Sequence, residues 1–288
     1  MKKTIIFTLL CFAISIAAAA GFYFSGLQYD SPIGSLFASA YMFIPLLSVW
    51  ITSLLSKDKP FAGCGIKFKI NRWWFVAWLG MPLLSFVVVL ASSLMPGVDF
   101  SLHTDLMNLS IESFAEKGLS ISPWAVIGIS LLSALMASIT INCLFAFGEE
   151  VAWRGFLAHE LHTLGFWKKS ILIGIIWGFW HAPLILMGHN YPSHPVLGIF
   201  MMVGMCVLVS PILMYLRERS GSVIAAAIAH GAINATAGLA VVLLSGFDEL
   251  LCGFTGLAGF AVMLTLNIII ALTYRPKSNN PTPKQPSN

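Results

Sequence analysis

The chain has 288 residues, of which 58% are hydrophobic and only 10% are charged, and its mean hydropathy is +0.85. Soluble domains carry about 25% charged residues, so the composition excludes a disordered chain, a collagen-like chain and a solvent-exposed globular enzyme. The net charge of +4 does not indicate nucleic-acid binding, because the basic residues lie in short segments between apolar runs. The sequence therefore predicts an integral membrane protein.

Eight apolar runs long enough to cross a bilayer as helices follow one another along the chain. The first run, from Thr4 to Phe24, follows two lysines like a secretory signal peptide, but it is longer than a typical signal core, so we expect an uncleaved helix. The fold class we predict is an all-α polytopic membrane protein. Its expected spans lie near residues 4–25, 36–55, 73–95, 124–147, 170–187, 196–216, 221–245 and 251–273.

The charges between these runs predict the orientation of the protein. All of the 16 Lys and Arg residues except Lys117 and Arg154 fall in the segments that are cytoplasmic if the N-terminus is cytoplasmic. Basic residues are enriched in cytoplasmic loops, and a wrong span count would move every later loop to the other side. We therefore expect both termini in the cytoplasm. The other side would carry Asp30, Asp99, Asp105, Glu112, Glu116, Asp248 and Glu249.

The runs divide the chain into a membrane domain and a tail. In the long outer segment 96–123, the mixed residues Leu106 to Phe114 predict either a short interfacial helix or a plain loop. The proline-rich polar end predicts a disordered cytoplasmic tail. The expected parts are three N-terminal helices with the outer loop (1–123), a core of helices four to seven (124–245), a last helix (246–274) and the tail (275–288).

Few ionisable side chains interrupt the apolar runs, and such side chains mark candidate functional sites because they are costly in a bilayer. At 1.5 Å per residue, those in the fourth, fifth and seventh runs all fall in the cytoplasmic half of the membrane and are expected to converge. They are Glu149, Glu150 and Arg154 at the end of the fourth run, His181 in the fifth, and His230 with Asn234 in the seventh.

Helical spacing sorts these residues. Glu150 and Arg154 are four residues apart, which is the spacing of an intrahelical ion pair. Glu149 is rotated by about 100° from Glu150, so it has no partner on its own helix and is free to face another one. His230 and Asn234 share one face of the seventh helix. A carboxylate facing histidines and an amide is typical of a hydrolytic site, with the carboxylate as general base and the others as hydrogen-bond donors.

Each feature also has a purely structural interpretation. Glu150 with Arg154 is more often a structural pair at a helix end, and a single histidine in a membrane helix often serves as a hydrogen-bonding residue between helices. Their shared depth favours the functional interpretation. Three other histidines, His103, His189 and His194, fall in outer loops and are expected to lie away from the site.

In order along the chain, these residues resemble the CAAX protease and bacteriocin-processing family of intramembrane endopeptidases, to which the Ras-converting CAAX endopeptidase belongs. Glu149 to Arg154 matches Glu-Glu-x-x-x-Arg, and His230 to Asn234 matches His-x-x-x-Asn. The second family motif is usually Phe-x-x-x-His, and here Trp177 stands in the Phe position before His181. The resemblance covers about residues 124–245.

The resemblance implies a role for each residue. Glu149 would act as general base on water together with His181, and His230 and Asn234 would hold the oxyanion or the water. Glu150, Arg154 and Trp177 would support the site. A metallopeptidase would instead hold a metal such as zinc through Glu149, His181 and His230. Zinc is the one cofactor that the resemblance implies as an alternative, and we prefer a metal-independent mechanism.

The resemblance also implies the partners: the bilayer and a membrane-embedded or lipid-anchored protein or peptide substrate. A chain that begins with Lys-Lys before its first apolar run suggests a bacterial cell membrane, with the active site opening to the cytoplasm. A bacterial location favours a membrane peptide, a bacteriocin precursor or an anchored regulator over a prenylated CAAX protein.

Two functions from other classes compete with proteolysis. A catalytically silent family member would be an immunity or membrane scaffold protein, which has no need of the full set of polar residues. A small transporter or proton channel would use Glu and His as a relay. The absence of internal repeats and the few polar residues in the outer halves of the helices argue against transport.

Overall fold

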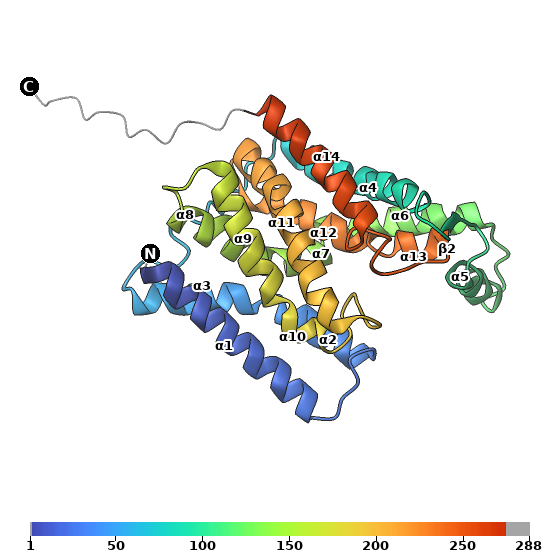
Figure 1. The fold of residues 1–288 in the computed structure, drawn as a ribbon, viewed down its shortest axis with the longest axis horizontal. Helices are drawn as coiled ribbons and strands as arrows, with labels where there is room; N and C mark the ends of the chain where they lie inside the picture. The colour runs from blue at the N-terminus through green and yellow to red at the C-terminus, as the bar shows by residue number, and fades with distance from the viewer. Residues whose placement is uncertain (1, 275–288) are drawn as a thin grey trace, which may run out of the picture.

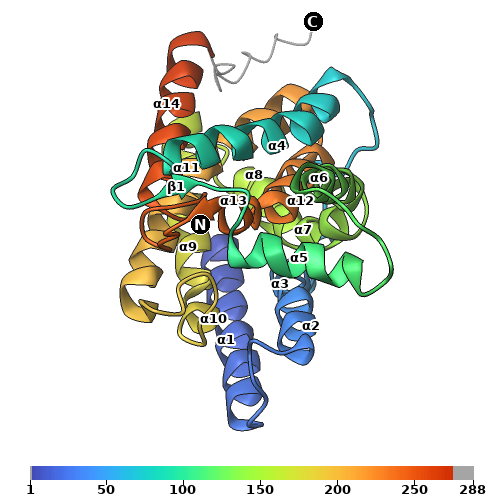
Figure 2. The ribbon, with the colours of Figure 1, turned by 90° about the vertical axis from the view of Figure 1, so that its right-hand side faces the viewer.

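The computed structural model describes residues 2–274, and the regular elements in these residues are helices apart from two strands of two residues each. The predicted tail at 275–288 lies outside the described residues. Figures 1 and 2 show the helices packed as one bundle, with α5 and the strands at one end. The elements are α1 (Lys2–Phe24), α2 (Pro32–Tyr41), α3 (Ile44–Leu55), α4 (Arg72–Ser92), β1 (Asp99–Phe100), α5 (Asp105–Ala115), α6 (Pro123–Ile139), α7 (Ile141–Glu150), η1 (Val151–Leu157), α8 (Ala158–Glu160), α9 (Phe166–Trp180), α10 (Ala182–Ile185), α11 (Pro195–Ser220), α12 (Val223–Thr236), α13 (Leu239–Leu243), β2 (Leu244–Ser245) and α14 (Leu257–Thr273).

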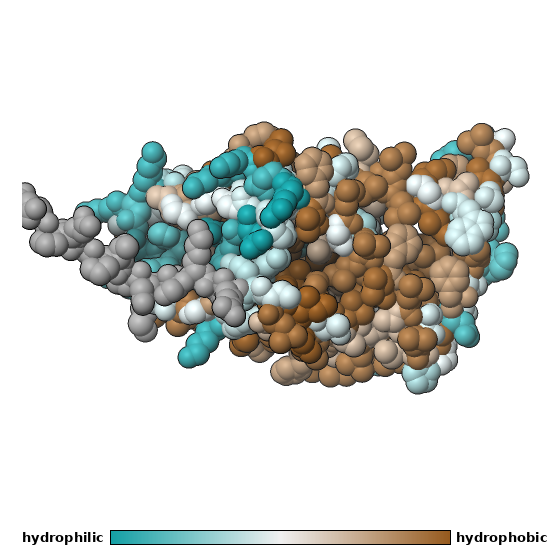
Figure 3. Space-filling view, turned by 90° about the horizontal axis from the view of Figure 1, so that it is seen from above, coloured by the Kyte–Doolittle hydropathy of each residue, from teal (hydrophilic) through white to brown (hydrophobic). Residues whose placement is uncertain are grey.

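This architecture confirms the prediction of an all-α polytopic membrane protein. Five helical segments are long and apolar enough to cross a membrane, and the bent pair α6–α7 makes a sixth if it is one span. Helices α9 and α14 correspond to the other two predicted runs but have 15 and 17 residues, so the count of eight spans stays a prediction. Figure 3 shows a broad hydrophobic surface beside a polar end, as expected for a protein in a bilayer.

Several predicted runs are not single helices, and two of them break before the site residues. The second is α2 followed by α3, which are separated at Met42 and Phe43. The fourth bends by 45° at Thr140 and continues to Glu160, well beyond the expected end at 147. Thr140 has a ψ of −104°, outside the helical range, and no proline marks the break. The bend turns α7 toward the middle of the bundle, where it carries both glutamates.

The centre of the bundle is α12. In the membrane-spanning window of Val223–Leu243, 67% of the residues are buried, compared with 28% in that of α1. Helix α12 is rich in alanine and carries Gly231, where a Cβ atom would lie 2.9 Å from the backbone of Asn142 and of Cys143 on α7. Small residues allow close approach of helix backbones in membranes. Helices α7 and α12 therefore lie against each other without a layer of large side chains between them.

The two ends of the bundle differ in charge, as predicted. At one end, the loop 56–71 and the ends of α9 and α11 carry the lysines and arginines, and Lys3 pairs with Asp58 over 2.5 Å. At the other end, β1 pairs with β2 in antiparallel register, with Asp99 opposite Ser245. The helix predicted near Leu106 to Phe114 is present as α5, and it lies at this second end. We call the two ends the basic end and the acidic end.

Candidate active site

The two glutamates lie where α7 passes into a π-helix. Both are fully or nearly fully buried, at 2% exposure for Glu149 and 0% for Glu150. The π-helix η1 follows directly, and π-helical turns are rare and frequent at functional sites. Glycines flank the pair: a Cβ on Gly148 would lie 2.7 Å from the carbonyl oxygen of Met42, and one on Gly155 would lie 2.9 Å from that of Cys64. The segment with the glutamates is thus held tightly against the N-terminal part of the chain.

Two tryptophans hold one oxygen of Glu149. The indole Nε1 of Trp177 donates to Oε2 over 2.6 Å, and that of Trp153 donates to the same oxygen over 3.2 Å. Trp153 lies four residues after Glu149, so the expectation of no partner on its own helix was wrong. The reason is that an indole N–H is a polar donor inside a residue counted as apolar. The other oxygen, Oε1, has no hydrogen-bond partner among residues 2–274, and Glu149 lines a cavity.

The second glutamate bridges two partners. Arg154 donates Nη1 to Oε1 of Glu150 over 2.8 Å, which confirms the predicted ion pair. His230 donates its Nδ1 hydrogen to the same oxygen over 2.9 Å, because a carboxylate only accepts. The guanidinium of Arg154 also lies over the ring of Trp177, 4.3 Å from its centroid. Glu150, Arg154 and Trp177 thus form a buried support that joins the fourth, fifth and seventh predicted spans.

The first histidine ends α9. His181 donates Nδ1 to the carbonyl oxygen of Trp177 over 2.9 Å, since a carbonyl only accepts. Its ring packs edge-on against Trp180, whose own Nε1 donates to Ser15 on α1 over 2.7 Å. In both His181 and His230, Nδ1 is therefore engaged by the protein, and Nε2 is the nitrogen left to act on a substrate or water.

One cavity brings the predicted catalytic residues together. It has a volume of about 300 Å³ and is otherwise lined mainly by apolar side chains, methionines among them. Asn234, one turn after His230, is exposed and makes no side-chain hydrogen bond with the described residues. The lining contains Glu149, Trp177, His181, His230 and Asn234.

The same cavity contains a histidine that the prediction excluded. His189 lies in the loop 186–194 and lines the cavity, and its Nδ1 lies 3.0 Å from the hydroxyl oxygen of Tyr29. Burial lowers the pKa of His189 from 6.5 to about 4. The exclusion was wrong because it assumed a site in the cytoplasmic half. Helix α9 begins four residues earlier than expected. His181 therefore lies about 22 Å from the start of the helix at 1.5 Å per residue, close to the loop 186–194 at the acidic end.

The expectation of an opening to the cytoplasm therefore conflicts with the predicted orientation. The cavity reaches the loop 186–194 and Thr255, and both lie at the acidic end, away from the loops that carry the basic residues. Basic loops in the cytoplasm and a cavity open to the cytoplasm are not compatible in this fold.

The described side chains do not fit a metal site. Among residues 2–274, no three His, Cys, Asp or Glu side chains are arranged to hold a metal ion. The alternative ligand set Glu149, His181 and His230 is therefore not assembled as a metal site, and no step below involves a metal.

Comparison with known proteins agrees with this geometry. Residues 124–236 match the family model described as type II CAAX prenyl endopeptidase Rce1-like. The chain is also similar to a CAAX prenyl protease 2 of Methanococcus maripaludis, with 43% identity over 44 residues, which is 15% of this chain and 16% of the relative. This match of residues 124–236 confirms the resemblance to the Rce1-like endopeptidase family, and the matched segment contains the site residues Glu149, Glu150, Arg154, Trp177, His181, His189, His230 and Asn234.

Proposed function

We propose that the protein is an intramembrane endopeptidase of the CAAX-processing type, with Glu149 as general base. The observation that carries the proposal is the asymmetric environment of Glu149. Two indole N–H groups fix one carboxylate oxygen, and the other has no partner within the described part of the chain and belongs to a residue that lines the cavity. A general base needs this arrangement, because it must accept a proton from water without losing its orientation.

The neighbouring residues supply the rest of the reaction. Because Nδ1 of His181 and of His230 is engaged by the protein, Nε2 is the nitrogen that hydrogen-bonds and orients the attacking water beside Glu149. The water oxygen attacks the carbonyl carbon while Glu149 takes a proton. The amide of Asn234 donates a hydrogen bond to the oxyanion of the tetrahedral intermediate. Glu149 then returns the proton to the leaving nitrogen, and the C–N bond breaks.

The cavity limits the substrate to an extended segment. The volume of the cavity, about 300 Å³, equals that of about ten water molecules in the liquid. The cavity therefore accommodates a few residues of an extended chain rather than a folded domain. We propose a membrane-embedded or lipid-anchored polypeptide as substrate. The similarity to a CAAX prenyl protease makes prenylated proteins one such class, and bacteriocin precursors or other peptides of a bacterial cell membrane are the other.

Comparison of peptide termini tests the proposal without knowledge of the substrate. Membranes from cells that express the wild type or Glu149→Gln at matched levels are compared by N-terminal proteomics. Glu116→Gln, an exposed carboxylate at the acidic end, is the matched control. We expect new termini with the wild type and Glu116→Gln that are missing with Glu149→Gln. Identical termini in all three would instead support a catalytically silent immunity or scaffold protein.

A further inference from the structure

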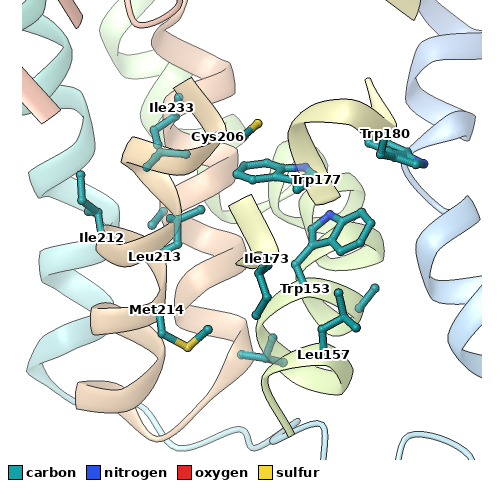
Figure 4. Close-up of a cluster of buried hydrophobic side chains, with 14 of the residues drawn as sticks. Trp153, Leu157, Ile173, Trp177, Trp180, Cys206, Ile212, Leu213, Met214 and Ile233 are labelled. Atoms are coloured by element: carbon teal, nitrogen blue, oxygen red, sulfur yellow. The ribbon is translucent and has the colours of Figure 1, made fainter. Parts of the chain in front are cut away.

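The residues below Glu149 close the cavity toward the basic end. Trp153 and Leu157 of η1 pack with Ile173 of α9 and with Leu213 and Met214 of α11, and each of these five side chains is 0% exposed. Figure 4 shows this cluster below Trp177, on the side away from Cys206 and Ile233. A close-packed apolar layer excludes water and peptides, so within residues 2–274 this cluster separates the basic end from the carboxylate.

A second layer covers this cluster at the basic end. The loop 56–71 crosses the end of α11 and the start of α12, and two of its backbone carbonyls accept hydrogen bonds there. The Ser222 hydroxyl donates to the carbonyl of Lys67 over 2.6 Å, and the Val223 amide donates to that of Gly65 over 3.0 Å. The side chain of Cys64 is fully buried. The loop is thus part of the packed structure, and none of its residues lines the cavity that contains Glu149.

The cavity opens toward the acidic end. Three of its lining residues, Asn190, Asn234 and Ala237, are exposed, and they belong to the loop 186–194 and to the end of α12 with the turn that follows. Ser39 on α2 lines the facing side. The floor of the cavity is formed by buried residues such as Glu149 and the mouth by exposed ones, which gives the direction of entry.

We infer that the substrate and the attacking water reach Glu149 from the side of the membrane opposite the basic loops. Basic residues favour the cytoplasmic side of a membrane, so this entrance lies on the extracytoplasmic side. The inference rests on the proposed function in one respect: if the site cuts polypeptides, its substrates are segments exposed at the outer face of the membrane, such as exported peptides or the outer ends of membrane anchors.

Thiol labelling of intact cells tests the direction of entry. Ser39→Cys and Ala237→Cys place single new thiols on opposite sides of the mouth, and Lys59→Cys places one in the exposed basic loop as the matched control. The five native cysteines are buried or half-buried, so the wild type gives the background. The reagent is a membrane-impermeant maleimide, applied to intact cells and to permeabilised cells.

We expect Ser39→Cys and Ala237→Cys to be labelled in intact cells to the extent reached after permeabilisation, and Lys59→Cys to be labelled only after permeabilisation. The reverse pattern would overturn the inference, and so would a lack of labelling at both mouth positions in intact cells. The readout does not depend on proteolysis. Expected labelling without any cleavage by the wild type would refute the proposed function and leave the direction of entry standing.

Discussion

Trp177 both packs in the site and donates a hydrogen bond there, which an aromatic side chain without an N–H group could not do. Its ring packs on His181 and lies below the guanidinium of Arg154, and its indole N–H makes the shorter of the two hydrogen bonds to Glu149. Phenylalanine, usual at this position in the family that the sequence resembles, would keep the packing and lose the donor. In this chain, the orientation of the catalytic carboxylate depends on Trp177.

Trp177→Phe isolates this donor. A hydrogen bond to a charged group contributes about 1.5–3 kcal/mol, so we expect kcat to fall by about 10- to 100-fold with little change in KM. Trp153→Phe, which removes the longer bond, should have a smaller effect. The measurement is the initial rate of cleavage by purified protein of a substrate found by terminus analysis. Unchanged kcat in Trp177→Phe would show that the indole does not position Glu149.

The two adjacent glutamates should respond differently to the same change. Glu150→Gln removes the charge that compensates the fully buried Arg154, and breaking a buried pair in this way costs about 3–5 kcal/mol. Glu149→Gln leaves an oxygen for both indole donors. We therefore expect Glu150→Gln to lower both the folded yield and the thermal midpoint in detergent, and Glu149→Gln to abolish cleavage at a nearly normal midpoint. Equal midpoints would contradict the structural role of Glu150.

The residues that carry charge could be predicted from the sequence, and the indole donors could not. Glu149, His181, His230 and Asn234 stand out because charged or polar groups are costly in apolar helices, and the structure gathers them in one cavity. The indole nitrogen atoms of Trp153 and Trp177 belong to residues that a hydropathy pattern counts as apolar. Only the helix arrangement shows that they point at the same carboxylate oxygen.

At the scale of elements, the contact of α7 with α12 determines whether the two halves of the site meet. A Cβ on Gly231 would lie 2.9 Å from backbone atoms of α7, and backbone cannot move aside as a flexible side chain does. Overpacking of this kind costs about 1–3 kcal/mol. Gly231→Ala should therefore lower the thermal midpoint and reduce cleavage, because it moves His230 away from Glu150.

Gly128 provides the matched control for this prediction. It also lies inside a helix, α6, but nothing lies within 4 Å of the position its Cβ would take. Alanine favours a helix over glycine by about 1 kcal/mol, so Gly128→Ala should leave the midpoint unchanged or raise it. Both variants are measured by thermal unfolding in the same detergent. A similar response of the two glycines would show that the α7–α12 contact is not tight in the protein.

Hydropathy predicted where the helices lie but not how they break. Each predicted apolar run overlaps a helix or a pair of helices, because burial of the backbone in a bilayer requires helices. The bend at Thr140 and the π-helix after Glu150 arise from packing against α12 and the loop 56–71, and no local residue pattern marks them. The bend precedes the helix that carries the glutamates, so the depth of the site was the least predictable feature.

At the scale of the whole molecule, charge gives the orientation and packing gives the entrance, and the two are separate properties of the sequence. The basic loops are a local compositional feature. The buried apolar cluster between the basic end and Glu149 combines residues from three helices that are distant in the sequence, η1, α9 and α11. A sequence pattern predicts the basic loops directly, whereas the buried cluster can be recognised only in the fold. This difference explains why the predicted orientation and the predicted side of the opening agree at the level of sequence but conflict in the fold.

A buried histidine beside the cavity, His189, also makes the stability of the protein sensitive to acid. His189 joins the loop at the cavity to Tyr29 in the connection between α1 and α2, and burial lowers its pKa from 6.5 to about 4. Between these values the unfolded chain binds a proton that the folded protein does not, so the free energy of unfolding falls as the pH drops through this window. The full loss corresponds to about 3.4 kcal/mol.

We expect the thermal midpoint in detergent to be constant above about pH 7.5 and to decline as the pH falls toward 4. His189→Gln keeps a polar side chain beside Tyr29 but does not titrate, so it should reduce the slope below pH 6.5 and leave the midpoint at high pH nearly unchanged. His103→Gln, an exposed histidine at the acidic end, is the control and should keep the slope of the wild type. An identical pH profile in His189→Gln and the wild type would show that His189 is not the group that senses acid. Because the cavity faces the outer side, the pH that matters in the cell is that outside the membrane.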